Sequence, residues 1–172
     1  EDELNSFRKK FLFPEHKGKK VIYFCGNSLG LQPVNTREYV NQELSDWEKF
    51  GVEGHFQARH PWYPYHEFLR DNMAQVVGAL PRETVVMNSL TANVHFMLVS
   101  FYKPDSKRYK IICEASAFPS DQYALQSQVK FHGCNPKDAI IELKPRDGEF
   151  TLRHEDILAA IENHKDSFAL VF

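Results

Sequence analysis

The sequence predicts an α/β fold in which a mainly parallel sheet is covered by helices on both faces. Three observations support this class. Short apolar runs alternate with longer segments whose apolar residues recur at helical spacing. Polar helix starts follow directly on several of the apolar runs. No internal repeat and no low-complexity linker interrupts the pattern. Alternating β and α units of this length favour parallel strands joined by helical crossovers.

The first half of the chain is expected to hold three helices and one strand. A short amphipathic helix before Pro14 has an apolar side made of Leu4, Phe7 and Phe11. Residues 21–24 are apolar and predict a strand. Pro33 opens a helix with a shared apolar face, formed by Val40, Leu44 and Trp47. A helix after Pro64 ends at Gly78 and is expected to turn four side chains inward: Leu69, Met73, Val76 and Val77.

The second half predicts four strands that alternate with three helices. The strands are expected at residues 85–87, 109–114, 140–143 and 167–172. The first helix has one apolar face, formed by Val94, Leu98 and Phe101, and the second runs from Asp121 to Phe131. A turn at Asp147-Gly148 precedes the last helix, for which Thr151 is the expected N-cap.

Composition narrows the class of protein. The chain has 172 residues, of which 42% are hydrophobic and 26% charged, and this is ordinary for a soluble globular protein. A net charge of -2 argues against nucleic acid as a main partner. Three cysteines do not make a disulfide framework and favour a reducing compartment, so a cytoplasmic location is expected. No apolar stretch reaches the roughly 18 residues of a membrane span, so no membrane partner is expected.

A metal site is not expected. Three histidines lie close together in the sequence, His55, His60 and His66, but they are five and six residues apart and separated by prolines. This is not the spacing of metal ligands on a helix. The nearby aromatic residues suit either a core or a subunit contact: Trp62, Tyr63 and Tyr65.

The junction at residues 88–93 is a candidate phosphate site. Its sequence is Asn-Ser-Leu-Thr-Ala-Asn, and it places Ser89, Leu90 and Thr91 at the start of a predicted helix. Free backbone N–H groups, the positive end of the helix dipole and two hydroxyls meet there, and these groups suit a phosphate. The same residues would also serve as a plain helix N-cap without a ligand.

A second junction, residues 117–121, suits a flat heteroaromatic ligand. Phe118 could stack on such a ring, while the carboxylate of Asp121 could meet a protonated ring nitrogen. The alternative is that Phe118 belongs to the core and that Ser120 or Asp121 caps the helix.

Together with the glycine string at residues 26–30, these junctions resemble the kynureninase family of pyridoxal-phosphate enzymes, which have the aspartate aminotransferase fold. Further matching strings are Gly54-His55, residues 59–62, residues 107–111 and residues 144–146. The spacing agrees as well: Ser28 precedes His55 by 27 residues, Thr91 by 63 and Phe118 by 90. Several ungapped motifs in one register are far more specific than any one of them.

The resemblance implies a cofactor, pyridoxal 5'-phosphate, and a set of residues around it. Leu90 and Thr91 match residues that hold the cofactor phosphate. Residues 118–121 match the cofactor-ring segment, which here consists of Phe118, Pro119, Ser120 and Asp121. Ser28 and His55 match residues of the substrate pocket, and His55 is expected to contact the aryl group of the substrate.

The resemblance also implies a division of the chain. Residues 1–32 correspond to an N-terminal arm and substrate-loop segment. Residues 33–172 correspond to the N-terminal part of the large cofactor-binding domain of a fold type I enzyme. The Schiff-base lysine of the family is expected beyond Phe172, so the catalytic residues stay unknown and the isolated chain is expected to be an inactive piece of a longer protein.

The expected reaction is hydrolytic cleavage of kynurenine or 3-hydroxykynurenine between the β and γ carbons. The products are alanine and anthranilate or 3-hydroxyanthranilate, in tryptophan catabolism and NAD biosynthesis, and the enzyme is expected to be a homodimer. Two alternatives stay open. The chain could be an inactive short product that acts as a binding or dimerisation module, or a part of another fold type I pyridoxal-phosphate lyase.

Overall fold

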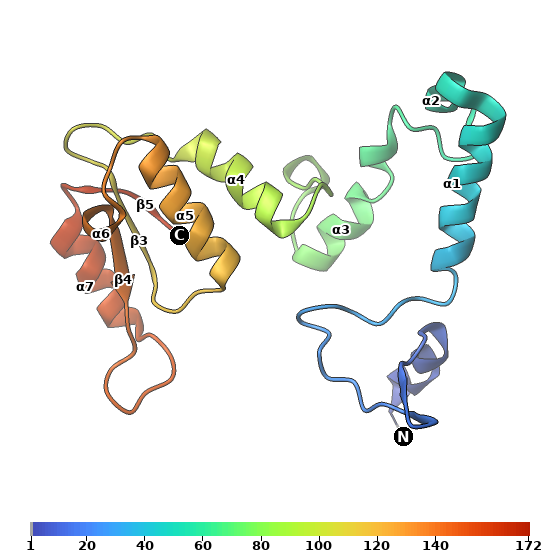
Figure 1. The fold of residues 1–172 in the computed structure, drawn as a ribbon, viewed down its shortest axis with the longest axis horizontal. Helices are drawn as coiled ribbons and strands as arrows, with labels where there is room; N and C mark the ends of the chain where they lie inside the picture. The colour runs from blue at the N-terminus through green and yellow to red at the C-terminus, as the bar shows by residue number, and fades with distance from the viewer. Residues whose placement is uncertain (1) are drawn as a thin grey trace. The chain divides into compact units, whose positions relative to one another are not determined.

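The computed structural model describes residues 2–172 and contains two compact units, of which the first ends at Val86 and the second is Met87–Phe172 (Figure 1). The first unit is helical apart from one short hairpin, whereas the second is an α/β layer structure. The predicted division at residues 32 and 33 rests on the resemblance alone and stays a prediction.

The first unit contains short helical elements and a two-stranded hairpin. In chain order they are η1 (Glu3–Lys10), β1 (Glu15–His16), β2 (Lys19–Lys20), α1 (Thr36–Phe50), η2 (Gly51–Glu53), α2 (Gly54–Gln57), η3 (Tyr65–Glu67), α3 (Arg70–Val77) and η4 (Pro81–Glu83). The predicted helix before Pro14 is confirmed as the 3-10 helix η1. Gly78, with φ of +71° in the left-handed region, ends α3 as predicted.

Three predictions in this part of the chain are wrong. Residues 21–24 and 85–87 are not strands in the structure. A strand requires a neighbour along its length for its backbone hydrogen bonds. Among the described residues the first run has one such bond, from the N–H of Val21 to the Pro14 carbonyl at 3.0 Å, and neither run pairs in a sheet. The α3 side chains that were expected to point inward are exposed, and only Ala74 of this helix is buried. Within the described part of its unit α3 packs mainly against the short helices η3 and η4, which cannot cover its apolar face.

The second unit contains a parallel sheet with helices between its strands. Its elements are α4 (Leu90–Phe101), β3 (Lys110–Glu114), α5 (Pro119–Phe131), α6 (Pro136–Ala139), β4 (Ile140–Leu143), α7 (His154–His164) and β5 (Phe168–Val171). The strand order is β4-β3-β5, and both pairings are parallel. The predicted α/β class with a parallel sheet is confirmed.

The core of the second unit lies between the sheet and the pair α4 and α5. Ile111 and Cys113 of β3 contribute to a buried cluster with residues of the two helices and of α6: Leu98, Tyr102, Ala124, Leu125, Val129 and Ala139. Because side chains alternate along a strand, Ile112 faces the other side of the sheet. There it lines a cavity together with Leu152 and Ile157, from the segment before α7 and from α7 itself. Helices thus cover both faces.

The last helix begins later than predicted. Thr151 was expected to be the N-cap, but α7 starts at His154 and Arg153 occupies the N-cap position without a side-chain cap. Charged pairs hold this helix start instead. The Arg146 guanidinium donates two hydrogen bonds to the Asp156 carboxylate, at 2.8 and 2.6 Å, and Arg153 bonds Glu149.

Candidate functional site

The end of α4 is placed by a contact with the start of β3. Tyr102, which follows the last residue of α4, donates its hydroxyl hydrogen to the carbonyl oxygen of Tyr109 at 2.5 Å, directly before β3 begins. The end of α4 therefore lies beside the amino end of β3. A helix of 12 residues is about 18 Å long. Leu90 and Thr91 are its first two residues and lie at the end of the helix that is remote from this contact. Figure 1 shows α4 beside α5, with which it packs.

The first turn of α4 offers unpaired backbone donors. The N–H of Asn93 is bonded to the carbonyl of Ser89 at 3.0 Å, so the N–H groups of Leu90, Thr91 and Ala92 precede the first intrahelical bond. Ser89 occupies the N-cap position, but its hydroxyl makes no capping hydrogen bond. Leu90 and Thr91 are exposed. This helix start can therefore donate hydrogen bonds to an anion.

Asn93 has a buried acceptor next to this turn. Its amide nitrogen donates to the Met87 carbonyl at 3.4 Å, while its Oδ1 atom has no partner among the described residues. This acceptor oxygen needs a hydrogen-bond donor as its partner, and a phosphate dianion offers only acceptors. Asn93 is therefore not counted among the candidate phosphate ligands.

The start of α5 presents an aromatic ring to solvent at the carboxyl end of β3. Phe118 is the N-cap residue of α5 and its side chain is 71% exposed, while Pro119 occupies the first helical position. Neither Ser120 nor Asp121 caps the helix, and the Ser120 hydroxyl lies 3.5 Å from the Asp121 carboxylate. The alternative of a core phenylalanine beside a capping residue is therefore wrong for this segment.

A cavity of about 290 Å³ lies at the carboxyl ends of the three strands. Its wall includes the carboxylates of Glu114 and Asp121, and apolar side chains make up most of the rest: Leu143, Leu152, Ile157, Val171 and Phe172. Burial raises the pKa of the Cys113 thiol, another lining residue, to about 11. This thiol is therefore neutral at physiological pH and unsuited to act as a nucleophile. The cavity suits an apolar, flat group with a positively charged edge.

The two predicted substrate residues belong to the first unit. The N–H of Ser28 donates to the carbonyl of Cys25 at 3.0 Å in a turn. His55 lies in α2, where its imidazole meets the indole of Trp62 at a centroid distance of 5.5 Å and an interplanar angle of 87°. Both side chains are exposed. No hydrogen bond joins Ser28 to His55 within residues 2–172.

The surroundings of His55 depend on a contact between residues that are distant in the sequence. Glu43 of α1 accepts a hydrogen bond from the indole Nε1 of Trp62 at 2.8 Å. The two residues are 19 positions apart, and no local pattern in the sequence links them. The available signals were the matching strings at residues 54–55 and 59–62, since a glycine beside a candidate site residue allows close approach of another group to the backbone.

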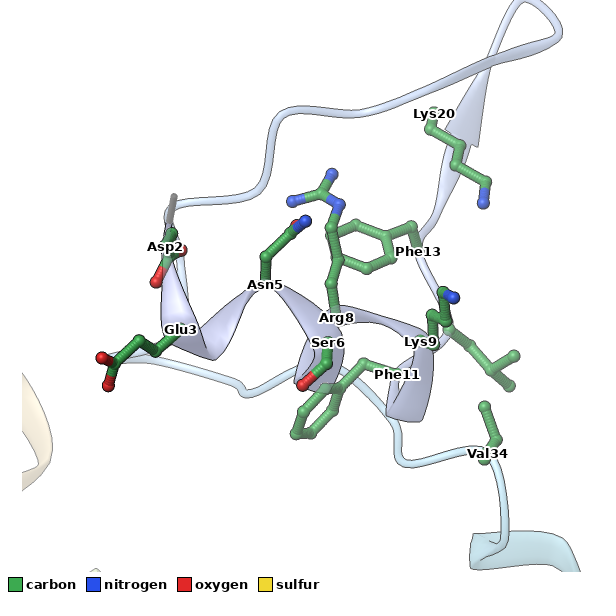
Figure 2. Close-up of a pocket in the computed structure, with 11 residues that line it drawn as sticks. Asp2, Glu3, Asn5, Ser6, Arg8, Lys9, Phe11, Phe13, Lys20 and Val34 are labelled. Atoms are coloured by element: carbon green, nitrogen blue, oxygen red, sulfur yellow. The ribbon is translucent and has the colours of Figure 1, made fainter.

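The N-terminal arm contains a larger cavity, of about 690 Å³, but none of the predicted site residues lines it. Figure 2 shows Asp2 and Glu3 at one end and Lys9 and Lys20 at the other. The Arg8 guanidinium lies over the ring of Phe13, 4.2 Å from its centroid. Because both signs of charge line this cavity, it selects no ligand by charge.

Within the part of the chain that the structure describes, no helix combines the length and apolar character needed to cross a membrane. The same residues bring together no group of three or more potential metal ligands.

The chain is similar to kynureninases along nearly its whole length. It is 56% identical over 171 residues to the kynureninase of Flavobacterium psychrophilum, 56% over 172 residues to that of Myxococcus xanthus and 49% over 182 residues to that of Nematostella vectensis. Each alignment covers 99% of this chain but only 39–40% of the relative. No family model matches the chain. These similarities confirm the resemblance of the chain to a portion of a kynureninase.

Proposed function

We propose that this chain is the part of a kynureninase that binds pyridoxal 5'-phosphate and contributes to the substrate pocket. The complete enzyme would cleave kynurenine or 3-hydroxykynurenine by hydrolysis, releasing alanine and an anthranilate. The observation that carries the proposal is the carboxyl end of the sheet in the second unit. A cavity lined by Asp121 lies there, and the same unit contains the free donors at the start of α4 and the exposed ring of Phe118.

The residues at the starts of α4 and α5 have the chemistry to hold the cofactor. The N–H groups of Leu90 and Thr91 and the hydroxyl of Thr91 would donate to its phosphate. Phe118 would stack on the pyridine ring, and the Asp121 carboxylate would hold a proton on the ring nitrogen, with Pro119 and Ser120 completing the segment. When bound, the cofactor supplies an electron sink for bond cleavage at the substrate amino acid. The role of this chain's residues is to bind and orient it.

The residues of the first unit would act on the substrate. An imidazole such as that of His55 can stack on an aryl ring and also hydrogen-bond a ring substituent. Ser28 can donate or accept a hydrogen bond at a polar group of the substrate. Hydrolysis further requires a base to activate water and donors to stabilise the resulting oxyanion, and we assign neither role to a residue of this chain.

The complete protein is proposed to be a cytoplasmic homodimer in tryptophan catabolism and NAD biosynthesis. Large exposed aromatic side chains in the first unit support a subunit interface: Trp47, Phe56 and Tyr63. The odd number of cysteines supports a reducing compartment.

The test uses the full-length protein that contains this chain. Release of anthranilate and 3-hydroxyanthranilate measures the activity, and titration of the apo-protein with pyridoxal 5'-phosphate measures the dissociation constant. Thr91→Ala should weaken cofactor binding about tenfold to a hundredfold, because a hydrogen bond to a charged phosphate contributes about 1.5–3 kcal/mol.

Thr151→Ala is the matched control, since it makes the same change at an exposed residue of the same unit that caps no helix. It should leave the dissociation constant unchanged. An unchanged cofactor affinity in Thr91→Ala would refute the phosphate site, and a full-length protein that cleaves neither substrate would refute the proposed reaction.

A further inference from the structure

We propose that Trp62 is a positioning residue that orients His55 toward the aryl group of the substrate, and that Glu43 and Gly54 hold Trp62 in place. The inference rests on the proposed function, in which His55 contributes to the substrate pocket. It adds three residues to that pocket, none of which is among the predicted site residues.

Gly54 allows the indole of Trp62 to lie directly against the backbone. A Cβ atom at residue 54 would come within 2.6 Å of Cζ3 and 2.8 Å of Cζ2 of Trp62. Real Cβ atoms essentially never approach other atoms so closely, and the rigid indole has no flexible end that could move aside. Gly54 is buried, and it directly precedes His55. The position of the Trp62 ring therefore depends on the absence of a side chain at residue 54.

Glu43 fixes the other side of the indole. Its carboxylate accepts the hydrogen bond from Trp62 Nε1 at 2.8 Å, in a partly buried setting. Hydrogen bonds to charged groups are stronger than those between neutral groups. Because Glu43 lies in α1, the longest helix of this unit, the bond ties the Trp62 ring to a rigid element.

The backbone around Trp62 is tied down at three further points. The N–H of Trp62 donates to the Gly54 carbonyl at 3.3 Å, and the N–H of Tyr63 donates to the His55 carbonyl at 3.1 Å. Between them, the N–H of Arg59 donates to the Asp46 carboxylate of α1 at 3.0 Å, and Asp46 is only 5% exposed. Residues 54–63 thus form an anchored loop, a term used below for this segment, in a unit that otherwise buries few side chains.

His55 depends on this arrangement for its orientation. Its imidazole meets the Trp62 ring nearly at a right angle, 5.5 Å between centroids, and edge contacts of this kind are favourable for aromatic rings. Within the described residues its side chain makes no hydrogen bond, so the ring contacts with Trp62 and with Phe56 are what restrain it. Both ring nitrogens are left to a ligand. A fixed Trp62 therefore aims a hydrogen-bonding imidazole at whatever aryl substituent enters.

The experiment compares substrates that differ in one hydroxyl group. In the full-length protein, kcat/KM is measured for kynurenine and for 3-hydroxykynurenine, together with the melting temperature, for Trp62→Phe, Glu43→Ala and Glu43→Gln. Trp62→Phe should lower kcat/KM for 3-hydroxykynurenine about tenfold more than for kynurenine, because one oriented hydrogen bond to the hydroxyl is lost. Glu43→Ala should shift the ratio in the same direction, and Glu43→Gln should restore much of it, since the amide oxygen can still accept from Nε1.

Tyr39→Phe is the control, because Tyr39 is exposed on α1 of the same unit and, within the described residues, forms no aromatic ring pair with the anchored loop. Its ratio of kcat/KM values should equal that of the parent protein. An equal loss on both substrates with a lower melting temperature would assign Trp62 to packing alone and overturn the inference. If Trp62→Phe does not fold, an unchanged ratio in Glu43→Ala overturns it equally.

The outcome separates this inference from the proposed function. A parent protein that cleaves both substrates, together with variants whose ratio does not move, refutes only the role of Trp62. A parent protein that cleaves neither substrate refutes the proposed function and the inference with it.

Discussion

The two units use similar amphipathic helices but differ in what covers their apolar faces. In the second unit, Leu98 of α4 and Leu125 of α5 are almost completely buried against β3 and its neighbours. In the first unit, Leu44 of α1 is 54% exposed and Val76 of α3 is 80% exposed. Segments whose apolar residues recur at helical spacing are therefore helices in both units. A core formed only where parallel strands supplied a broad apolar surface.

The same difference separates two kinds of candidate site. In the second unit, the cofactor-side residues stand at the ends of strands and helices that share one core, so the fold itself positions Thr91 and Phe118. In the first unit, His55 depends on a few specific bonds and one tight contact in the anchored loop. We therefore expect the cofactor side to tolerate loop changes that the substrate side does not.

The largest expected effect tests this contrast in burial directly. Leu125→Ala should destabilise the protein by about 2–5 kcal/mol, because it removes a leucine side chain that is 1% exposed and leaves a cavity. Leu44→Ala makes the same change in another helix, at a half-exposed position, and should cost far less. Urea unfolding of this 172-residue chain, followed by circular dichroism, gives both free energies.

A different pattern would break the comparison. If Leu44→Ala destabilised the chain as strongly as Leu125→Ala, the apolar face of α1 would be covered in solution. The first unit would then also bury a core, and the contrast in burial between the two units would not hold. Repeating the pair in the full-length protein shows whether additional residues cover that face.

The helices and strands of the second unit could be predicted from the sequence because local patterns determine them. The strand at residues 140–143 was predicted with the bounds that the structure has, and the helix from Asp121 to Phe131 begins only two residues early, at Pro119. The runs 21–24 and 85–87 have the same apolar character but are not strands, since pairing depends on a neighbour that local sequence does not reveal. The prediction that the apolar side chains of α3 point inward was wrong for a related reason. Amphipathic spacing identifies an apolar face, but it does not show whether another element covers that face.

The candidate site shows the same limit. Leu90, Thr91, Phe118 and Asp121 could be singled out because they follow apolar runs at strand-to-helix junctions. The bond between Glu43 and Trp62 could not, because it joins residues 19 positions apart, and the matching string at residues 59–62 does not include Glu43. Thr151 was predicted as a cap from its residue type, but charged pairs hold the start of α7.

The next prediction, of intermediate size, tests whether the first unit acts on the substrate and the second on the cofactor. His55→Phe in the full-length protein should leave the dissociation constant for pyridoxal 5'-phosphate unchanged while altering substrate preference. Phenylalanine keeps a flat surface but removes the polar atoms, so 3-hydroxykynurenine should lose about tenfold to a hundredfold more kcat/KM than kynurenine. Steady-state kinetics with both substrates and a cofactor titration give the two quantities.

Two results would contradict this assignment. Equal losses on both substrates together with a lower melting temperature would make His55 a structural residue of α2. A weakened cofactor affinity would place His55 on the cofactor side and remove the functional distinction between the units.

The smallest expected effect lies at the surface of the second unit, where charge and not burial holds the start of α7. The paired hydrogen bonds from Arg146 hold the pKa of Asp156 below its usual value. A carboxyl with a lowered pKa in the folded state stabilises the protein above the pKa of its unfolded state, and this contribution is lost as the pH falls through the folded pKa. Asp156→Asn should therefore reduce the loss of melting temperature between pH 7 and about pH 3, near and below ordinary carboxyl values. Asp147→Asn, in the turn that precedes α7, should not. Because these side chains face solvent, the difference should shrink in high salt. An equal acid sensitivity in parent and Asp156→Asn would show that the pair contributes nothing to folding, leaving the buried residues of the second unit as the source of its stability.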